Sequence, residues 1–356
     1  MTSELSSLCS YAKGKVSVDT LSKRNYVSTE NMVPNKGGIV DAGALPSAQY
    51  TQQYMKDDIL VSNIRPYFKK IWMADDDGGC SNDVLVFRAE CGCDSTFLYY
   101  VLANDAFFNY ASATSKGTKM PRGDKTAIMQ YEVPCFNHET QLRIGKLLRS
   151  IDDRITANKK INDNLQQQAQ AIYSSMFIDN PDPAWSHGHL SDLITVKYGK
   201  DHKKLADGIY PVYGSGGIMR YVERPLYNKE SVLIPRKGTL NNVMYVNQPF
   251  WSVDTMFYTE MKLPNVAKFV YHFVKAKDLV SMNAGSAVPS MTTDILNAME
   301  VVIPSASALE EFESLVAPMY EAMEANDVQS KALSQMRDTL LPKLMSGEID
   351  VSAVQL

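Results

Sequence analysis

Two stretches of the chain carry mostly apolar side chains at spacings that alternate between three and four residues. The first stretch places them at Ile144, Leu148, Ile151, Ile155, Asn158, Asn162, Leu165, Ala169, Ile172 and Met176. The second places them at Phe312, Val316, Met319, Met323, Asn326, Ser330, Leu333, Arg337, Leu340 and Leu344. This spacing is typical of a coiled-coil seam. Each stretch therefore predicts a helix of about 34 residues, roughly 50 Å long.

The two stretches repeat one pattern, because every seam position of the second lies 168 residues after its counterpart in the first. Both seams turn polar at the same place, Asn158/Asn162 and Asn326/Ser330, and polar seam residues fix register and partner. We expect the helices to pair with each other, antiparallel, because a whole domain separates them. The alternative is two unrelated helices that pack on their own domains. Pro318 should kink the second helix or mark its true start.

The repeat continues outside the helices, with offsets that change from motif to motif. The matched segments are Leu5-Ser6-x-Leu8 with Gly14-Lys15 against Leu190-Ser191-x-Leu193 with Gly199-Lys200, Ile59–Val61 against Val232–Ile234, Ser81-x-Asp83 against Ser252-x-Asp254, Gly117-x-x-x-Pro121 against Gly285-x-x-x-Pro289, and Val133-Pro134 against Ile303-Pro304. Changing offsets indicate a shared skeleton with loops of different length. The first half has the longer loop before its first core strand.

Each half is thus predicted to be a mixed α/β domain followed by a long helix. The expected segments are residues 1–138 and 179–308 for the domains, and residues 139–178 and 309–356 for the helices. Proline ends the strand before each helix, at Pro134 and Pro304. The fold class is α+β, with two similar domains joined and separated by two antiparallel coiled-coil helices, related by an internal pseudo-twofold repeat.

The charge is unevenly distributed over the 356 residues, whose net formal charge is −4. The first domain has a net charge of −1, the first helix +2 and the second domain +1, whereas residues 309–356 reach −6. The opposite signs of the two helices favour their pairing. The domains are close to neutral, so a local basic face on each stays compatible with binding to phosphates.

No cofactor or metal is expected. The five cysteines are odd in number and irregularly spaced, and Cys91-Gly92-Cys93 lacks a second ligand pair, so a zinc site and a disulfide framework are both disfavoured. No run of about 18 apolar residues is present. The N-terminus has no basic stretch followed by an apolar one, so we expect a cytoplasmic protein without a membrane anchor.

The sequence motifs of DNA-modifying enzymes are not matched. A methyltransferase would need an Asn/Asp-Pro-Pro-aromatic motif, and Asn180-Pro181-Asp182-Pro183 lacks the adjacent prolines and the aromatic residue. Gly214-Ser215-Gly216-Gly217 departs from the dinucleotide-binding fingerprint and is better interpreted as a tight turn. Asp75-Asp76-Asp77 beside two glycines is typical of a solvated loop rather than a magnesium site. We therefore expect a chain that is not itself an enzyme.

Several segments, in their order and duplication, resemble the specificity subunits of type I restriction–modification systems. They are Leu340-Leu341-Pro342-Lys343-Leu344-Met345-Ser346-Gly347-Glu348-Ile349, Tyr26-Val27-Ser28-Thr29-Glu30-Asn31-Met32, Tyr210-Pro211-Val212-Tyr213-Gly214-Ser215-Gly216-Gly217-Ile218 and Gly285-Ser286-x-x-Pro289. The resemblance covers essentially the whole chain. It implies that each variable domain reads one half of a split site on double-stranded DNA, while the helices set the unread spacer.

The resemblance also implies partners. Such a subunit carries two modification subunits that methylate adenine and recruits two restriction subunits that act as motor and nuclease. The chemistry would then lie in those partners.

Candidate DNA contacts are basic or amide residues on loops flanked by Gly, Ser or Pro, since such residues bind phosphates and base edges. In the first domain they are Asn63, Arg65, Lys69, Lys116, Lys119, Arg122 and Lys125. In the second they are Lys200, Lys203, Lys204, Arg220, Arg236, Lys237, Asn241 and Asn242, with Tyr213 and Tyr221 as stacking candidates. Arg65 and Arg236 are favoured because they follow equivalent strands. For most single lysines a solvated surface role is the alternative.

Two other classes of function stay open at this point. One is a self-contained enzyme without a familiar motif. The other is a scaffold whose helices bind partners without any reading of DNA.

Overall fold

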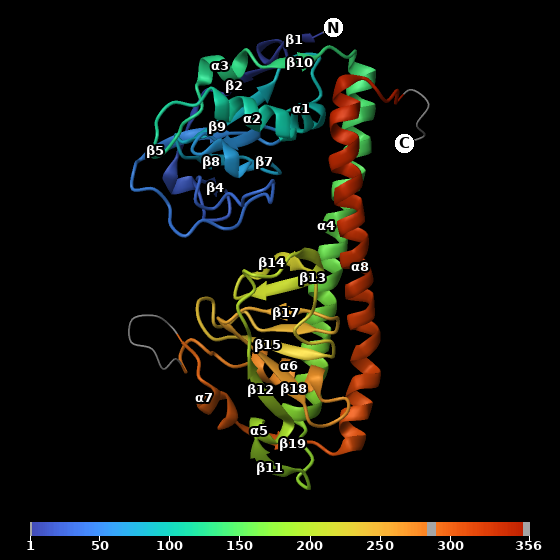
Figure 1. The fold of residues 1–356 in the computed structure, drawn as a ribbon. Coiled ribbons are helices and arrows are strands. Elements are labelled where there is room, and N and C mark those ends of the chain that lie inside the picture. Colours follow the sequence, from blue (N-terminus) through green and yellow to red (C-terminus); the bar gives the residue numbers. More distant parts are fainter. Residues whose placement is uncertain (1, 283–289, 352–356) are drawn as a thin grey trace. The chain divides into compact units, whose positions relative to one another are not determined.

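The computed structural model describes residues 2–282 and 290–351 (Figure 1). The Gly285 and Pro289 match of the repeat lies outside these residues. The chain forms two compact units, and each contains parts of both long helices. The first unit comprises residues 1–158 and 328–356, and the second comprises residues 159–327.

Two four-stranded sheets build the α/β domain of the first unit. One has the order β2 (Cys9–Tyr11), β9 (Val84–Ala89), β6 (Ile59–Ser62), β7 (Ile71–Met73), with all neighbours antiparallel. The other has the order β3 (Lys15–Ser17), β5 (Tyr50–Tyr54), β8 (Gly78–Cys80), β4 (Tyr26–Val27), and only β4 and β8 are parallel. A small ladder pairs β1 (Thr2–Glu4) with β10 (Glu132–Pro134). The helices are α1 (Ser95–Ala103), α2 (Asp105–Ala113) and α3 (Lys125–Met129), with the short turns η1 (Leu5–Ser7), η2 (Val18–Thr20) and η3 (Pro66–Phe68).

The strand β6 is buried on both faces, because successive side chains of a strand point to opposite sides. Ile59 and Val61 enter a core shared with α1 and α2. Leu60 enters a second core shared with residues of the other sheet, such as Val27 and Tyr54. The first sheet is therefore a middle layer between helices and a second sheet.

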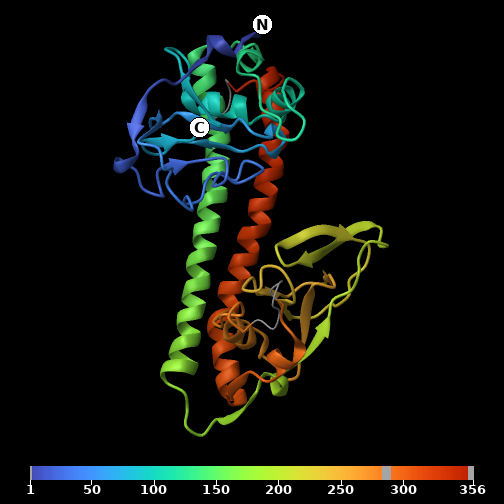
Figure 2. The ribbon, with the colours of Figure 1, turned by 90° about the vertical axis from the view of Figure 1, so that its left-hand side faces the viewer.

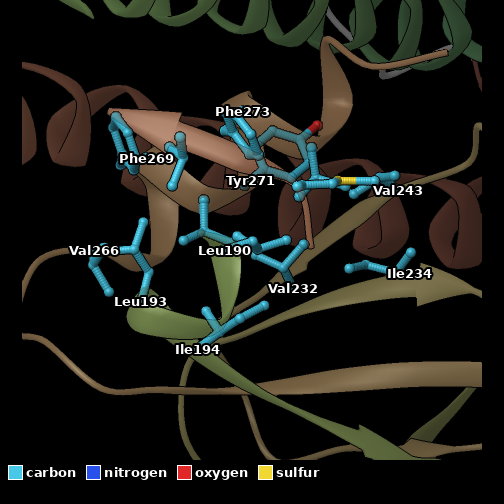
Figure 3. Packing of buried hydrophobic residues seen from close by; sticks show 14 of the residues in the cluster. Leu190, Leu193, Ile194, Val232, Ile234, Val243, Val266, Phe269, Tyr271 and Phe273 are labelled. Carbon is cyan, nitrogen blue, oxygen red and sulfur yellow. The ribbon is translucent and has the colours of Figure 1, made fainter. Parts of the chain in front are cut away.

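The second unit has the same layers. Its four-stranded sheet has the order β12 (Ile194–Tyr198), β18 (Met256–Met261), β15 (Ser231–Pro235), β16 (Met244–Val246). Its smaller sheet has the order β14 (Gly217–Val222), β13 (Asp207–Gly214), β17 (Trp251–Ser252), with β13 and β17 parallel. A further ladder pairs β11 (Ser186–His189) with β19 (Glu300–Ile303), and the helices are α5 (Leu190–Leu193), α6 (Ala267–Lys275) and α7 (Thr293–Asn297). Figure 3 shows the helix-side core, in which Leu190, Val232 and Phe269 from three elements meet.

The two domains share one topology, which confirms the predicted repeat. The strand order β2-β9-β6-β7 of the first sheet recurs as β12-β18-β15-β16, and the parallel pair β4 and β8 recurs as β13 and β17. The differences lie at the edges of the second sheet. There β5 joins β8 in the first unit, whereas β14 joins β13 in the second.

The predicted long helices are present as α4 (His138–Ser174), which continues into a π-helical turn η4 (Ser175–Asp179), and α8 (Ala306–Ser346). Since α8 begins at Ala306, Pro318 lies inside it and does not mark its start. All of the predicted seam side chains are buried or half-buried. Ile144 and Leu148 share a core with Leu344 in the first unit.

Polar contacts within each unit show that α4 and α8 run antiparallel, side by side (Figure 1 and Figure 2). In the first unit Asp152 accepts from Arg337, and the Asn158 amide donates to Ser330 at 3.1 Å. In the second unit the Asn326 amide donates to Asn162 at 2.8 Å. Residue numbers rise along one helix as they fall along the other. The pairing prediction is confirmed, and the interpretation as two unrelated helices is wrong.

The pairs Asn158–Ser330 and Asn162–Asn326 are equivalent under the 168-residue repeat. A shift of the two helices by one turn would leave one of the two α4 amides, Asn158 or Asn162, opposite an apolar seam residue, where an unmatched polar group costs about 1–3 kcal/mol. The polar seam positions therefore fix the register of the helices within each unit.

A second polar link ties a short helix of each domain to both long helices. In the first unit Tyr100 of α1 donates to Asp152 of α4 at 2.6 Å, and Arg337 of α8 donates to the same carboxylate at 2.6 Å. In the second unit His272 of α6 takes the place of Tyr100. Its Nδ1 lies 2.8 Å from Gln170 Oε1 of α4, and its Nε2 lies 2.9 Å from the Tyr320 hydroxyl of α8.

The imidazole of His272 should make the stability of the second unit depend on pH. Burial lowers the pKa of His272 from 6.5 to about 4. The unfolded chain binds a proton here near pH 6.5, and the folded chain does not until about pH 4. The free energy of unfolding should therefore fall as the pH drops through this window, by up to about 3 kcal/mol.

Urea unfolding at pH values from 7 to 4 measures this loss, followed in a Trp72→Phe background so that Trp185 and Trp251 report the second unit. His272→Gln keeps an amide donor and acceptor without a titrating ring, so its curve should be flatter by that amount. Identical pH dependence in both proteins would contradict the assignment.

Candidate nucleic-acid interface

In the first domain two loops meet where β6 ends. The backbone amide of Arg65 donates to the carbonyl of Pro121 at 2.8 Å, and that of Gly123 donates to the carbonyl of Asn63 at 3.1 Å. Ile64 and Arg122 form an isolated bridge beside them. The structure thus brings Asn63 and Arg65 close to Arg122, which follows them by almost 60 residues in the sequence.

The second domain repeats this meeting point where β15 ends. The amide of Met291 donates to the carbonyl of Arg236 at 2.9 Å, and Lys237 forms an isolated bridge with Ser290. In both domains the partner loop is the one that leads into the short helix α3 or α7. Arg65 and Arg236, which the repeat predicts to be equivalent, follow equivalent strands of the two domains.

Three of the six candidate cations of the first domain pair with carboxylates. Arg122 pairs with Asp83 at 3.0 Å, Lys116 with Asp124 at 2.6 Å, and Lys69 with Asp105 at 2.8 Å. Lys119 and Lys125 are exposed. The Lys116 ammonium lowers the pKa of Asp124, which also accepts from the backbone at the start of α3. These pairs position the cations and reduce the net charge that each presents.

Asn63 and Arg65 have polar atoms that the fold leaves without a partner. The Asn63 side chain is buried, and its Oδ1 has no hydrogen-bond partner among the described residues; the same holds for the buried Nε of Arg65. Arg65 also has a φ of 51°, in the left-handed region that non-glycine residues rarely adopt. Unpaired buried polar atoms and backbone strain are both enriched at functional sites.

In the second domain Arg236 is partly buried beside an aromatic ring. Its guanidinium carbon lies 5.3 Å from the centre of the Tyr198 ring, and its Nη1 donates to the carbonyl of Asp254 at 3.3 Å. Stacking on Tyr198 leaves the planar group oriented, as bidentate recognition of a base requires. The candidate lysines Lys200, Lys203, Lys204 and Lys237 are exposed.

The other candidates of the second domain have contacts within the fold. Arg220 pairs with Asp207 at 2.7 Å, and the Asn241 amide donates to Asp278. The Asn242 amide donates to the carbonyl of Ser215 at 2.8 Å, on the turn of the β13–β14 hairpin. Tyr213 is only 9% exposed and belongs to a hydrophobic core, whereas Tyr221 is 37% exposed. Tyr221 therefore offers more surface to a ligand than Tyr213.

Sequence reasoning missed an exposed aromatic pair on η3. Tyr67 and Phe68 are 51% and 38% exposed, with ring centres 4.8 Å apart, between the left-handed residues Arg65 and Lys69. The signal was present as two aromatic residues enclosed by basic ones after a proline. Exposed aromatic rings beside cations are a common feature of surfaces that bind nucleic acids.

Within residues 2–282 and 290–351, no group of three or more His, Cys, Asp and Glu side chains is placed to hold a metal ion. Cys91 and Cys93 are free thiols there. Among those same residues no helix is both long and apolar enough to cross a bilayer.

Known proteins share this sequence pattern and this fold. The specificity subunit of the type I restriction enzyme MjaIX from Methanocaldococcus jannaschii is 25% identical over 73% of the chain and 70% of its own length. That of the HindI enzyme from Haemophilus influenzae is 21% identical over 91% of the chain and 94% of its own length. The crystal structure of a type I restriction–modification S subunit from M. genitalium superposes with a TM-score of 0.62 at 19% identity, covering 97% of this chain and 96% of that one.

The sequence family described as the type I restriction modification DNA specificity domain matches this chain twice, over residues 1–167 and 184–312. The two matches correspond to the two α/β domains and to the helical residues that adjoin them. The chain therefore belongs to the family of type I restriction–modification specificity subunits.

Proposed function

We propose that this chain reads a bipartite site on double-stranded DNA, one half with each domain, and leaves the chemistry to partner subunits. The observation that carries the proposal is the duplicated domain, in which residues 1–138 and 179–308 follow one topology. A single contiguous site would not need two readers of the same fold.

Differences between the two domains support different half-sites. The shared sheets hold the loops after β6 and β15 in equivalent places, but these loops carry different side chains. Arg65 has an unpaired buried atom beside Tyr67, whereas Arg236 stacks on Tyr198. Base edges are discriminated by such local arrangements of donors and rings. An asymmetric DNA site is the expected consequence.

The proposed partners follow from the family. Two modification subunits that methylate adenine would dock on the chain, and two restriction subunits with translocase activity would join them in the cytoplasm. The helices α4 and α8 are the proposed spacer, because each contributes residues to both units and is paired with the other in each. Their fixed register would then fix the number of unread base pairs.

Mapping of methylated adenines across the genome, in cells with and without this chain, tests the function. We expect one bipartite motif to lose its methylation when the chain is removed. Unchanged methylation would contradict the proposal. Methylation by the purified chain alone, with a methyl donor, would identify a self-contained enzyme. An assembled complex without any sequence preference would identify a scaffold.

Lengthening both helices should lengthen the spacer and leave the half-sites unchanged. One heptad inserted between Asn158 and Asn162, with a matching heptad between Asn326 and Ser330, keeps the seam intact and adds about 10 Å. That length corresponds to about three base pairs. The same methylation mapping measures the result.

A seven-residue insertion after the exposed Gly43 serves as the control and should leave the motif unchanged. Half-sites that change when only the helices are lengthened would argue against the spacer role.

Arg236→Ala should weaken binding to the cognate site by about 5- to 150-fold, as expected when an interaction with a base of about 1–3 kcal/mol is removed. Binding to random DNA should change little. The exposed Arg224, changed to Ala, removes the same charge from the same domain and serves as the control. Competition binding of the assembled complex measures both affinities. If their ratio stays at the wild-type value, Arg236 does not read a base.

A further inference from the structure

We infer that a lysine-lined hollow in the first domain binds the phosphate backbone of DNA next to the first half-site. This inference rests on the proposed function and adds an interaction that fixes the position of the domain on the duplex. The hollow has a volume of about 510 Å³ and opens to solvent between the two sheets of the domain. Its walls come from the turn between β2 and β3, the start of β5, the segment that leads into β9, and α3.

The charge of this hollow is of one sign. Lys13, Lys15 and Lys125 line it, and none of its lining residues carries a carboxylate. Within the described residues these three lysines make no ion pair with an acidic side chain. The Lys125 ammonium lies 6.0 Å from the centre of the Tyr11 ring, which is uncharged and does not neutralise it. Three such cations around one concavity favour a ligand with several negative charges.

The contrast with the neighbouring cations supports this interpretation. Arg122 and Lys116 pair with Asp83 and Asp124, so their charges are already balanced. A phosphate approaching them would compete with a carboxylate, whereas one approaching Lys13 or Lys15 would not. The domain therefore has two groups of basic residues. Arg122 and Lys116 are oriented by carboxylates, whereas the lysines that line the hollow have no acidic partner within the described residues.

The hollow adjoins the proposed base-reading loops. Asn82 lines it and precedes Asp83, which holds Arg122. Lys125 lines it and follows Asp124, which holds Lys116. Interactions with phosphates fix the register of a protein on DNA, while those with base edges read sequence. A backbone-binding hollow directly beside the reading loops provides this division of tasks.

The turn that presents two of the lysines depends on glycine. Gly14 lies between Lys13 and Lys15 with a φ of +135°, in the range that favours glycine. A Cβ at this position would also lie 3.1 Å from the Gln53 side chain. The conformation of this turn is therefore set by the sequence, and the two lysines flank the hollow as a result.

The lysines of the hollow are mostly not repeated in the second domain. In the repeat Lys15 corresponds to Lys200, but Lys13 corresponds to Tyr198 and Lys125 to Thr293. The ring of Tyr198 instead lies against the guanidinium of Arg236. Only one of the three lysines is retained, so this cluster of three lysines is specific to the first domain.

The test replaces Lys13, Lys15 and Lys125 together by glutamine in the chain assembled with its modification subunits. All three side chains are exposed, so the fold should be kept, and melting curves of the complex check this. We expect binding to the cognate site and to random DNA to weaken by one common factor, on the order of tenfold at moderate salt. The slope of log affinity against log salt should become shallower by about 2.7, which is about 0.9 for each phosphate that the variant no longer neutralises.

A matched control changes Lys23, Arg24 and Lys56, three exposed cations of the same domain that do not line the hollow. It should retain nearly all of the salt dependence. Equal losses of affinity in both triple variants, or a loss confined to the cognate site, would overturn the inference. Saturable binding of inorganic phosphate to the DNA-free chain would overturn it too, since it would identify a small-anion site. A wild-type complex without preference for a bipartite site would refute the proposed function instead.

Discussion

Antiparallel pairing of α4 and α8 is the constraint on which each unit depends. The helices bring together segments far apart in sequence, so that Ile144 and Leu344 share a core with the strands of the N-terminal domain. In the other unit Tyr173 and Phe312 do the same for the second domain. Side chains of the long helices thus complete the helix-side core of each domain. The polar pairs Asn158–Ser330 and Asn162–Asn326 then select one register of the two helices.

A rigid frame with variable edges follows from this construction. The central strands are buried on both sides, and their alternating side chains serve two cores at once. Substitutions there would disturb packing in both layers. The ends of β6 and β15, by contrast, lead into loops whose Arg65 and Arg236 lie outside the hydrophobic cores. The polar link of each short helix to both long helices, through Tyr100 or His272, fixes how the frame is attached. Under the proposed function, substitutions in these loops would change specificity and leave the packing of the central strands intact.

The sequence was most informative where structure follows from periodicity. The seam spacing predicted both long helices, and the repeated motifs predicted a duplicated topology, because both patterns can be recognised from residue types and spacing alone. Of the two alternatives for Pro318, a start of the helix is excluded, since α8 begins at Ala306. A proline inside a helix can be tolerated when packing on both sides holds the neighbouring turns.

The candidate site was less predictable, because exposure and pairing of a loop side chain depend on distant segments. Asn63 and Tyr213 resembled surface residues, yet both are buried by contacts with remote parts of their domains. The carboxylates that hold Arg122 and Lys116 could not be assigned from sequence, and neither could the lysines that line the hollow. The different edge strands β5 and β14 likewise depend on loop lengths, which the sequence showed without indicating the resulting strand pairing.

Selection of DNA from a random library by the assembled complex tests the central claim most directly. If each domain reads its own half of the site, the enriched sequences should contain two conserved segments separated by an unread gap of constant length. Enrichment of one uninterrupted motif, or of two segments at variable distance, would contradict the idea of two readers held in a fixed register.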